Sequence, residues 1–210
     1  MAKPLEGICV LDMGTFITGP AAGSLLGDLG AEVIKVEMPG TGDPFRSFKG
    51  GLYSPHYQTY NRNKKSIELN TKLPGDLAAL DELVKGADVF IQNFRPGVAA
   101  RLGVDAERLQ GINPRLVYAQ ITGFGSDGPH RDRPAFDTVA QASAGFLRLL
   151  VNPEHPRVVG PALADALTGF YAAHGVVAAL YEREKTGKGR LVETSMFEAM
   201  CHFNLDDYTH

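Results

Sequence analysis

Residues 7–13 read Gly7-Ile8-Cys9-Val10-Leu11-Asp12-Met13, a short apolar run of the kind that forms a buried strand. A loop follows, then an apolar segment that begins at Pro20 and ends before Gly30, and then a second apolar run over residues 32–37. Proline at the start of a segment and glycine after its end are typical of a helix. Strand, loop, helix and strand in this order form a βαβ unit, whose two strands lie parallel. The beginning of the chain therefore predicts an α/β fold with a parallel sheet.

The rest of the chain continues this alternation of strands and helices. Apolar runs predict further strands at residues 66–69, 88–92, 116–121 and 190–194, and periodic patterns predict helices at residues 74–84, 98–102, 106–112, 136–142, 162–181 and after Ser195. Proline and glycine make residues 38–60 and 147–158 irregular. Because no repeat or linker divides residues 1–210, we expect one domain: a Rossmann-like open parallel sheet flanked by helices.

Composition limits the classes of function. The chain has 210 residues, 44% of them hydrophobic, and a formal net charge of -3, which indicates a globular protein without general attraction to nucleic acid. Cys9 and Cys201 do not have the spacing of a metal site or a disulfide framework, and no His-x3-His pair suggests zinc. No signal-type run and no 18-residue apolar stretch is evident, so we expect a cytoplasmic protein without a membrane span.

One acidic residue stands out in the helix predicted from Ala162 onward. Asp165 falls in the first turn of this helix and is the only acidic residue between Glu154 and Glu182. The unpaired N–H groups and the dipole of a helix start favour a charged carboxylate. A carboxylate that water cannot fully surround can attack an activated acyl group. Taken alone, however, this position favours a plainer role, in which Asp165 only stabilises the helix end.

Three further stretches are candidates for binding an anion or a nucleotide. Residues 61–66 contain a basic cluster that suits either a phosphate or a solvated turn. Residues 93–97 and the glycine-containing turn 122–129 each follow a strand, where ligands of open parallel sheets bind. Gly14 and Glu37 have the layout of a dinucleotide site, but the intervening loop is not G-x-G-x-x-G, so an ordinary βαβ turn is the favoured interpretation.

Several stretches together resemble the class III CoA-transferases of the CaiB/BaiF type, the family of formyl-CoA transferase and of the carnitine and bile-acid CoA-transferases. The resemblance extends in order over nearly the whole chain, although each stretch alone is weakly specific. The stretches are residues 4–7, 29–37, 63–69, 93–97, 122–125, 136–142, 160–169 and 185–189.

The resemblance implies that Asp165 is the catalytic nucleophile. Its carboxylate attacks the thioester of an acyl-CoA and forms an aspartyl mixed anhydride and CoA thiolate. The thiolate then attacks the anhydride, which gives an aspartyl-CoA thioester and a free acid, and an acceptor carboxylate completes the exchange. This chemistry needs no Ser-His pair, because a carboxylate is ionised at neutral pH without a partner base. N–H donors for the developing oxyanion are expected near Asp165 or in the Gly123–Gly125 turn.

The resemblance also implies where coenzyme A binds, with no metal ion involved. Lys72 and Arg101 are each expected to neutralise a phosphate. The matching positions are Phe16, Ile17 and Thr18 at the thiol end, Leu69 and Lys72 near the adenine, Asn93, Phe94, Arg95 and Arg101 along the pantetheine and phosphates, and Phe136.

Three positions depart from formyl-CoA transferase. That enzyme has Gln, Arg and Tyr where this chain has Ile17, Met38 and Phe136. These differences predict an acyl group less polar than formyl or oxalyl. Related racemases carry a catalytic His at the position of Phe136, and because phenylalanine cannot transfer a proton, racemase activity is not expected.

The resemblance implies a longer protein, in which a small domain and a returning segment follow and two chains interlock as a homodimer. We therefore expect residues 1–210 to be the N-terminal portion of the large domain, either truncated or completed by a partner chain. Three alternatives stay open: a CoA- or nucleotide-binding module without catalysis, an NAD-type oxidoreductase, and a structural fragment that binds neither ligand.

Overall fold

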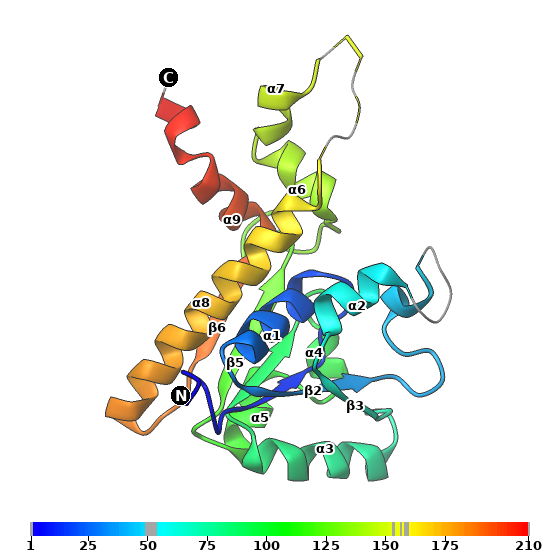
Figure 1. The fold of residues 1–210 in the computed structure, drawn as a ribbon, viewed down its shortest axis with the longest axis vertical. Coiled ribbons are helices and arrows are strands. Elements are labelled where there is room, and N and C mark those ends of the chain that lie inside the picture. The colour runs from blue at the N-terminus through cyan, green and yellow to red at the C-terminus, as the bar shows by residue number, and fades with distance from the viewer. Residues whose placement is uncertain (1, 49–53, 153, 156, 158–159, 210) are drawn as a thin grey trace.

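In a computed structural model that describes residues 2–48, 54–152, 154, 155, 157 and 160–209, the centre of the protein is a six-stranded parallel sheet (Figure 1). The strand order is β3-β2-β1-β4-β5-β6, and all neighbouring strands pair in parallel. This architecture confirms the predicted α/β fold. The strands are β1 (Cys9–Asp12), β2 (Glu32–Glu37), β3 (Lys65–Glu68), β4 (Val89–Gln92), β5 (Val117–Thr122) and β6 (Leu191–Ser195).

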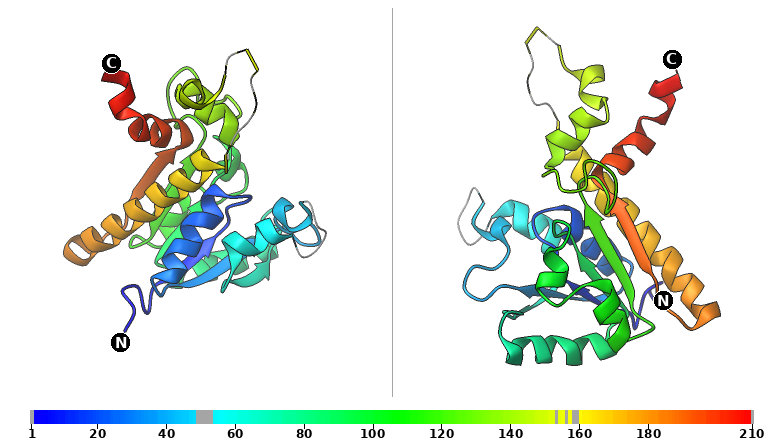
Figure 2. Two further views of the ribbon diagram at one scale, coloured as in Figure 1. Left: turned by 45° about the horizontal axis from the view of Figure 1, so that its top comes forward. Right: turned by 180° about the vertical axis from the view of Figure 1, so that it is seen from behind.

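Helices cover both faces of the sheet (Figure 2). Helices α1 and α8 lie on one face, whereas α3, α4 and α5 lie on the other. The helices are α1 (Thr18–Asp28), η1 (Pro44–Ser47), α2 (Pro55–Asn61), α3 (Pro74–Gly86), α4 (Val98–Arg101), α5 (Ala106–Ile112), α6 (Asp137–Ser143), α7 (Phe146–Leu150), α8 (Leu163–Thr186), α9 (Met196–Phe203) and η3 (Leu205–Thr209).

Strand periodicity explains why both faces are packed. Successive side chains of a strand point to opposite faces, so neighbouring apolar residues enter different cores. Val10 packs in the cluster that contains Leu26 of α1 and Val176 of α8, whereas Leu11 packs in the cluster that contains Leu80 of α3. Continuous apolar runs such as residues 7–13 are therefore the pattern of strands buried on both sides.

Most predicted elements are confirmed within a few residues, and the differences have local causes. Helix α8 continues beyond residue 181 and ends where Gly187 adopts a φ of 72°. Helix α2 lies inside the region predicted as irregular, because Ser54 accepts a hydrogen bond from the Tyr57 N–H and a proline follows the cap. Helix α7 likewise enters the second such region, while residues 49–53, 153, 156, 158 and 159 of the two regions lie outside the described residues.

Helix α8 also corrects the expectation that no apolar stretch is long enough to cross a membrane. By length and composition it is, but 44% of its 18-residue window is buried inside the protein. Gly169 of α8 packs directly on α1, and Val176 belongs to a core cluster under the sheet. These contacts are typical of the central helix of an α/β core, which satisfies the same length and composition criteria.

Candidate active site

The strand order reverses between β1 and β4, and two loops meet at the carboxyl ends of these strands. The amide of Asn93, directly after β4, accepts a hydrogen bond from the Thr15 N–H at 2.8 Å. Its Nδ2 group donates to the Thr15 carbonyl at 2.7 Å and to Thr18 Oγ1 at 2.8 Å. These hydrogen bonds place four predicted CoA positions, Phe16–Thr18 and Asn93, next to one another where the strand order reverses. Ligands of open parallel sheets bind at such a point.

Asp165 lies in the first turn of α8, as predicted, and its N–H donates to Asp137 Oδ1 at 3.2 Å. One helical turn further on, Gly169 approaches α1 so closely that a Cβ atom there would lie 3.0 Å from the Thr18 carbonyl oxygen. Residues four apart share one face of a helix. Asp165 therefore lies on the face of α8 that is directed toward the start of α1.

The surroundings of Asp165 differ from those expected at a helix start. Burial, and then the neighbouring carboxylate of Asp137, raise the pKa of Asp165 to about 7. Among the described residues, no cation or hydrogen-bond donor counteracts this increase. The prediction that the helix start favours the ionised form is therefore wrong, because the loss of water outweighs the helix dipole.

Two ionisable residues that interact with Asp165 were not identified from the sequence. Asp137, in the first turn of α6, accepts the Asp165 N–H and the Gln141 amide, and burial raises its own pKa. Tyr60 of α2 interacts electrostatically with both carboxylates, and its pKa is raised first by burial and then by Asp165. The sequence held one signal for Asp137: it directly follows Phe136, at the start of a predicted helix.

A cavity of about 310 Å³ opens at the carboxyl ends of β4 and β5. Phe94 and Arg95, both predicted CoA positions, line it together with Thr122 and Arg131. Arg101 reaches its rim, since its Nη1 atom would lie 3.5 Å from a Cβ atom at Gly97. Arg131 is paired with Asp132, which also lines the cavity. Phe94 and Arg95 therefore contribute an aromatic ring and a cationic side chain, which suit a ligand that has both apolar and anionic parts.

The remaining predicted CoA positions are spread further apart. Leu69 and Lys72 follow β3, the outermost strand, which is three strand spacings or roughly 15 Å from β4. Leu69 is 7% exposed and packs in the core, which leaves little of its side chain for a ligand, whereas Lys72 is exposed. Phe136 is 68% exposed and directly precedes Asp137, so it lies beside the acidic pair.

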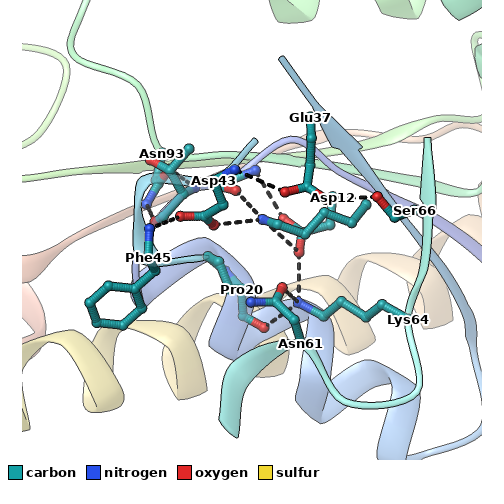
Figure 3. Close-up of polar contacts among 12 residues, drawn as sticks. Asp12, Pro20, Glu37, Asp43, Phe45, Asn61, Lys64, Ser66 and Asn93 are labelled. Atoms are coloured by element: carbon teal, nitrogen blue, oxygen red, sulfur yellow. Dashed lines mark hydrogen bonds and ion pairs between the residues drawn. The ribbon is translucent and has the colours of Figure 1, made fainter. Parts of the chain in front are cut away.

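A buried charge network of Asp12, Lys35, Asp43 and Lys64 lies next to the turn between β1 and α1 (Figure 3). Asp12 accepts a hydrogen bond from Lys64 Nζ at 2.7 Å and lies 4.0 Å from Lys35 Nζ, which is 3.0 Å from Asp43. Burial opposes the ionisation of Asp12, but the two lysines lower its pKa. The side chains of this network are at most 3% exposed. The network was not predicted from the sequence.

The network also bears on residues 61–66, for which a phosphate site and a solvated turn were left as equal alternatives. All three cations of that cluster are already paired with carboxylates: Arg62 with Asp28, Lys64 with Asp12 and Lys65 with Glu32. Lys64 is moreover directed into the core, where Pro20 O and Asn61 Oδ1 are its other acceptors. The cluster stabilises the fold and offers no unpaired cation to an anion.

Glu37 has a structural role that weakens the NAD-type alternative. It accepts hydrogen bonds from Arg46, Ser66 and the Asp43 N–H, which together lower its pKa to about 2 despite burial. A nicotinamide dinucleotide would need this carboxylate for its ribose. Because Glu37 is fully engaged, the end of β2 does not form the acidic part of a dinucleotide site.

In the glycine-containing turn after β5, one backbone N–H group already has a hydrogen-bond acceptor within the chain. The Gly125 N–H donates to Thr122 Oγ1 at 2.9 Å, so it is not available as the oxyanion donor that was expected from the sequence.

Within the part of the chain that the structure describes, no group of three or more His, Cys, Asp and Glu residues is placed to hold a metal ion.

The sheet, the cavity and the acidic pair define an α/β protein with a candidate ligand site at the carboxyl ends of β1, β4 and β5. The chain belongs to CoA-transferase family III, which it matches over residues 5–210.

Two characterised relatives illustrate the relationship. The acetyl-CoA:oxalate CoA-transferase of Acetobacter aceti is 44% identical over 204 residues, which cover 95% of this chain and 52% of that protein. The succinyl-CoA:glutarate CoA-transferase of Homo sapiens is 41% identical over 202 residues, which cover 94% of this chain and 46% of that protein. The chain thus spans about half the length of the curated relatives that it matches.

Solved structures have the same fold. A CaiB/BaiF family protein from Brucella suis superposes with a TM-score of 0.94 at 34% identity, and the match covers 100% of this chain and 57% of that one. Rv3272 from Mycobacterium tuberculosis superposes with a TM-score of 0.92 at 36% identity, with 99% and 58% of the chains covered.

Proposed function

We propose that this chain carries the nucleophile and part of the CoA site of an acyl-CoA:carboxylate CoA-transferase. The observation that carries the proposal is the carboxylate of Asp165, half-buried and raised in pKa by burial and by Asp137, with no cation beside it among the described residues, in a member of CoA-transferase family III. When it is ionised, a carboxylate that is so poorly solvated is a stronger nucleophile than one in water.

In the first step, the ionised Asp165 attacks the thioester carbonyl of an acyl-CoA. The carbon–sulfur bond breaks, CoA leaves as a thiolate, and Asp165 carries the acyl group as a mixed anhydride. The thiolate then attacks the aspartyl carbonyl, which releases the first acid and leaves an aspartyl-CoA thioester. An incoming carboxylate and the returning thiolate repeat these steps in reverse order, so that Asp165 is regenerated.

The positions of the predicted CoA residues support a route for the ligand. Residues 16–18 lie beside the face of α8 that carries Asp165, and the cavity lined by Phe94 and Arg95 lies further along the carboxyl edge. The relatives' names pair an acyl-CoA with a carboxylic acid, so we take donor and acceptor from these classes. The exposed ring of Phe136 beside the acidic pair favours an acyl group less polar than formyl.

We further propose that the full-length protein is a cytoplasmic homodimer that needs no metal ion. Sedimentation of the full-length protein tests the assembly, and loss of activity upon removal of metal ions would contradict the last part.

Trapping the acyl-enzyme tests the function. The chain is incubated with acetyl-CoA or succinyl-CoA, treated with hydroxylamine, and mapped by peptide mass spectrometry for an aspartyl hydroxamate. We expect the adduct at Asp165, its absence in Asp165→Asn, and its retention in Glu107→Gln, which removes an exposed acidic residue from the first turn of α5.

Adduct mapping together with ligand-binding assays on the same chain separates the alternatives. Binding of CoA in a thermal-shift assay without an adduct at Asp165 indicates a CoA-binding module and contradicts the transferase proposal. Binding of NAD in place of CoA indicates an oxidoreductase, and a flat response to both ligands indicates a structural fragment.

A further inference from the structure

The turn between β1 and α1 is held by side chains from other parts of the chain. The Gly14 N–H donates to Asp12 Oδ1 at 2.9 Å, and the Gly14 carbonyl accepts from Lys35 Nζ at 2.5 Å. Both backbone groups of Thr15 are bonded to the amide of Asn93. Such pairing, by the buried side chains of Asp12 and Lys35 and the half-buried side chain of Asn93, fixes the course of a turn more tightly than solvent does.

Phe16, the next residue, has an unusual backbone conformation. Its φ of 59° lies in the left-handed region, which costs a residue with a large side chain about 1–2 kcal/mol. Such a conformation persists only where its surroundings impose it. The Phe16 N–H donates to Asp43 Oδ1 at 3.1 Å, and its ring meets the ring of Phe45 edge-on at a centroid distance of 5.5 Å.

Asp43 is itself held firmly on the far side of the turn. Its side chain is fully buried, its other carboxylate oxygen lies 3.0 Å from Lys35 Nζ, and its own N–H donates to Glu37. The oxygen that accepts from Phe16 also accepts from the Phe45 N–H at 2.9 Å. Hydrogen bonds to an ionised acceptor are stronger than those to a neutral one, so Asp43 is suited to hold a strained residue.

The turn held in this way adjoins the proposed nucleophile. Residues 16–18 lead into α1, and Gly169 of α8 packs against the Thr18 carbonyl oxygen with no space for a Cβ atom. Asp165 lies one helical turn before Gly169 on the same face. A shift of the turn would therefore change the distance between Asp165 and any ligand that residues 16–18 bind.

We propose that Asp43 is a positioning residue for the transfer: its carboxylate holds the backbone of Phe16 in the left-handed region and thereby fixes residues 14–18 beside Asp165. The inference rests on the proposed function, because the positioned group is the acyl-CoA. Asp43 does not itself touch the reacting atoms. Its effect passes through the conformation of Phe16, and this separates it from a simple core ion pair with Lys35.

The first test is Asp43→Asn, alone and combined with Phe16→Gly. The amide has one oxygen, so its NH₂ group meets either the Lys35 ammonium or the N–H groups of Phe16 and Phe45. We expect adduct formation at Asp165 to slow by about tenfold or more, since small displacements strongly reduce reaction rates. Glycine adopts a positive φ without strain. In the Phe16→Gly chain, Asp43→Asn should therefore change the rate of adduct formation by less than about twofold.

The second test leaves the charge network intact and varies residue 16 alone. Phe16→Asn and Phe16→Gly tolerate a positive φ, whereas the β-branched side chain of Phe16→Val does not. We expect the valine variant to form the adduct more slowly than the other two and to exchange the amide hydrogens of residues 14–18 faster. This series decides the question even if Asp43→Asn does not fold.

The outcomes distinguish the two proposals. An adduct on the native chain whose rate is unchanged in Asp43→Asn, or equal losses in all three residue-16 variants, overturns the positioning role and leaves the function intact. If Asp43→Asn slows adduct formation equally in the native and in the Phe16→Gly chain, Asp43 forms only a structural ion pair, and the positioning role is overturned. Absence of the adduct from the native chain overturns the proposed function and this inference with it.

Discussion

Asp165 shows two physical effects in competition at one residue. A helix start stabilises a nearby anion by about 0.3–1 kcal/mol, whereas a pKa raised from 3.8 to about 7 corresponds to about 4 kcal/mol against ionisation. Burial beside Asp137 is therefore the larger effect. The change of charge of Asp165 therefore falls near neutral pH.

The first prediction concerns the pH dependence of the reaction. Only the ionised carboxylate attacks a thioester, so hydroxamate formation at Asp165 should rise with pH and reach half its maximum near the pKa of about 7. Asp137→Asn removes the neighbouring charge but keeps an oxygen acceptor, and the midpoint should move to lower pH. A midpoint that stays in place would show that Asp137 does not control the charge of Asp165; Glu107→Gln is the control without an expected shift.

The second prediction concerns stability. The pKa of Asp165 is raised in the folded chain, so its protonated form adds stability that is complete below about pH 4 and is lost as pH rises through about 7. Asp165→Asn cannot ionise, so its gain in stability over the native chain should be about 2.6 kcal/mol larger at pH 8 than at pH 5. Urea unfolding at both pH values measures the difference, and an equal difference at both would contradict the raised pKa.

At the scale of the elements, the contact between α1 and α8 determines where the nucleophile lies. The two helices approach closely because Gly169 has no side chain, and a Cβ atom there would lie 2.7 Å from Ala21 Cβ. Replacement of glycine by alanine within a helix normally stabilises it by about 1 kcal/mol. At this position the steric conflict exceeds that gain, because neither backbone can move without repacking the core.

The third prediction follows from this contact. Gly169→Ala should destabilise the chain by about 1–3 kcal/mol and displace Asp165 from residues 16–18, with loss of adduct formation. The matched control is Gly111→Ala in α5, where a Cβ atom meets nothing within 4 Å and stability should be unchanged or higher. Denaturant unfolding of both variants checks the prediction, and equal effects would show that the close packing is not decisive.

At the scale of the whole molecule, the charge network joins parts of the chain that are far apart in sequence. Asp12 ends β1, Lys35 lies on β2, and Lys64 precedes β3, so one cluster of charges holds three neighbouring strands together with α1. Because these charges are buried, each depends on its partners far more than an exposed ion pair does.

The fourth prediction tests that dependence. Asp12→Ala leaves Lys35 and Lys64 without their shared carboxylate and should destabilise the fold by about 3–5 kcal/mol. Asp28→Ala removes the half-exposed partner of Arg62 and should cost less than about 1 kcal/mol. Urea unfolding at neutral pH gives both values, and similar losses in the two variants would mean that burial adds little to the first pair.

Much of the fold could be predicted because its signals are local. The strand at residues 32–37 and the helix at residues 106–112 have the predicted bounds, since apolar runs, caps and glycine stops act within a few positions. The cap at Ser195 is also confirmed, with its hydroxyl accepting from the Glu198 N–H at 3.1 Å. Short helices such as α2, whose pattern is interrupted by proline, were missed.

By itself, the sequence determined the class of fold, the family and the position of Asp165 in the first turn of its helix, because periodicity, caps and motifs depend on neighbouring residues. Only the tertiary structure decided what surrounds that carboxylate. Asp137 is 28 positions from Asp165, Lys64 is 52 positions from Asp12, and Asn93 is 78 positions from Thr15. These pairs meet because the sheet and the helices packed on it bring segments that are distant in the sequence into contact, and the burial that results sets the charge of the site.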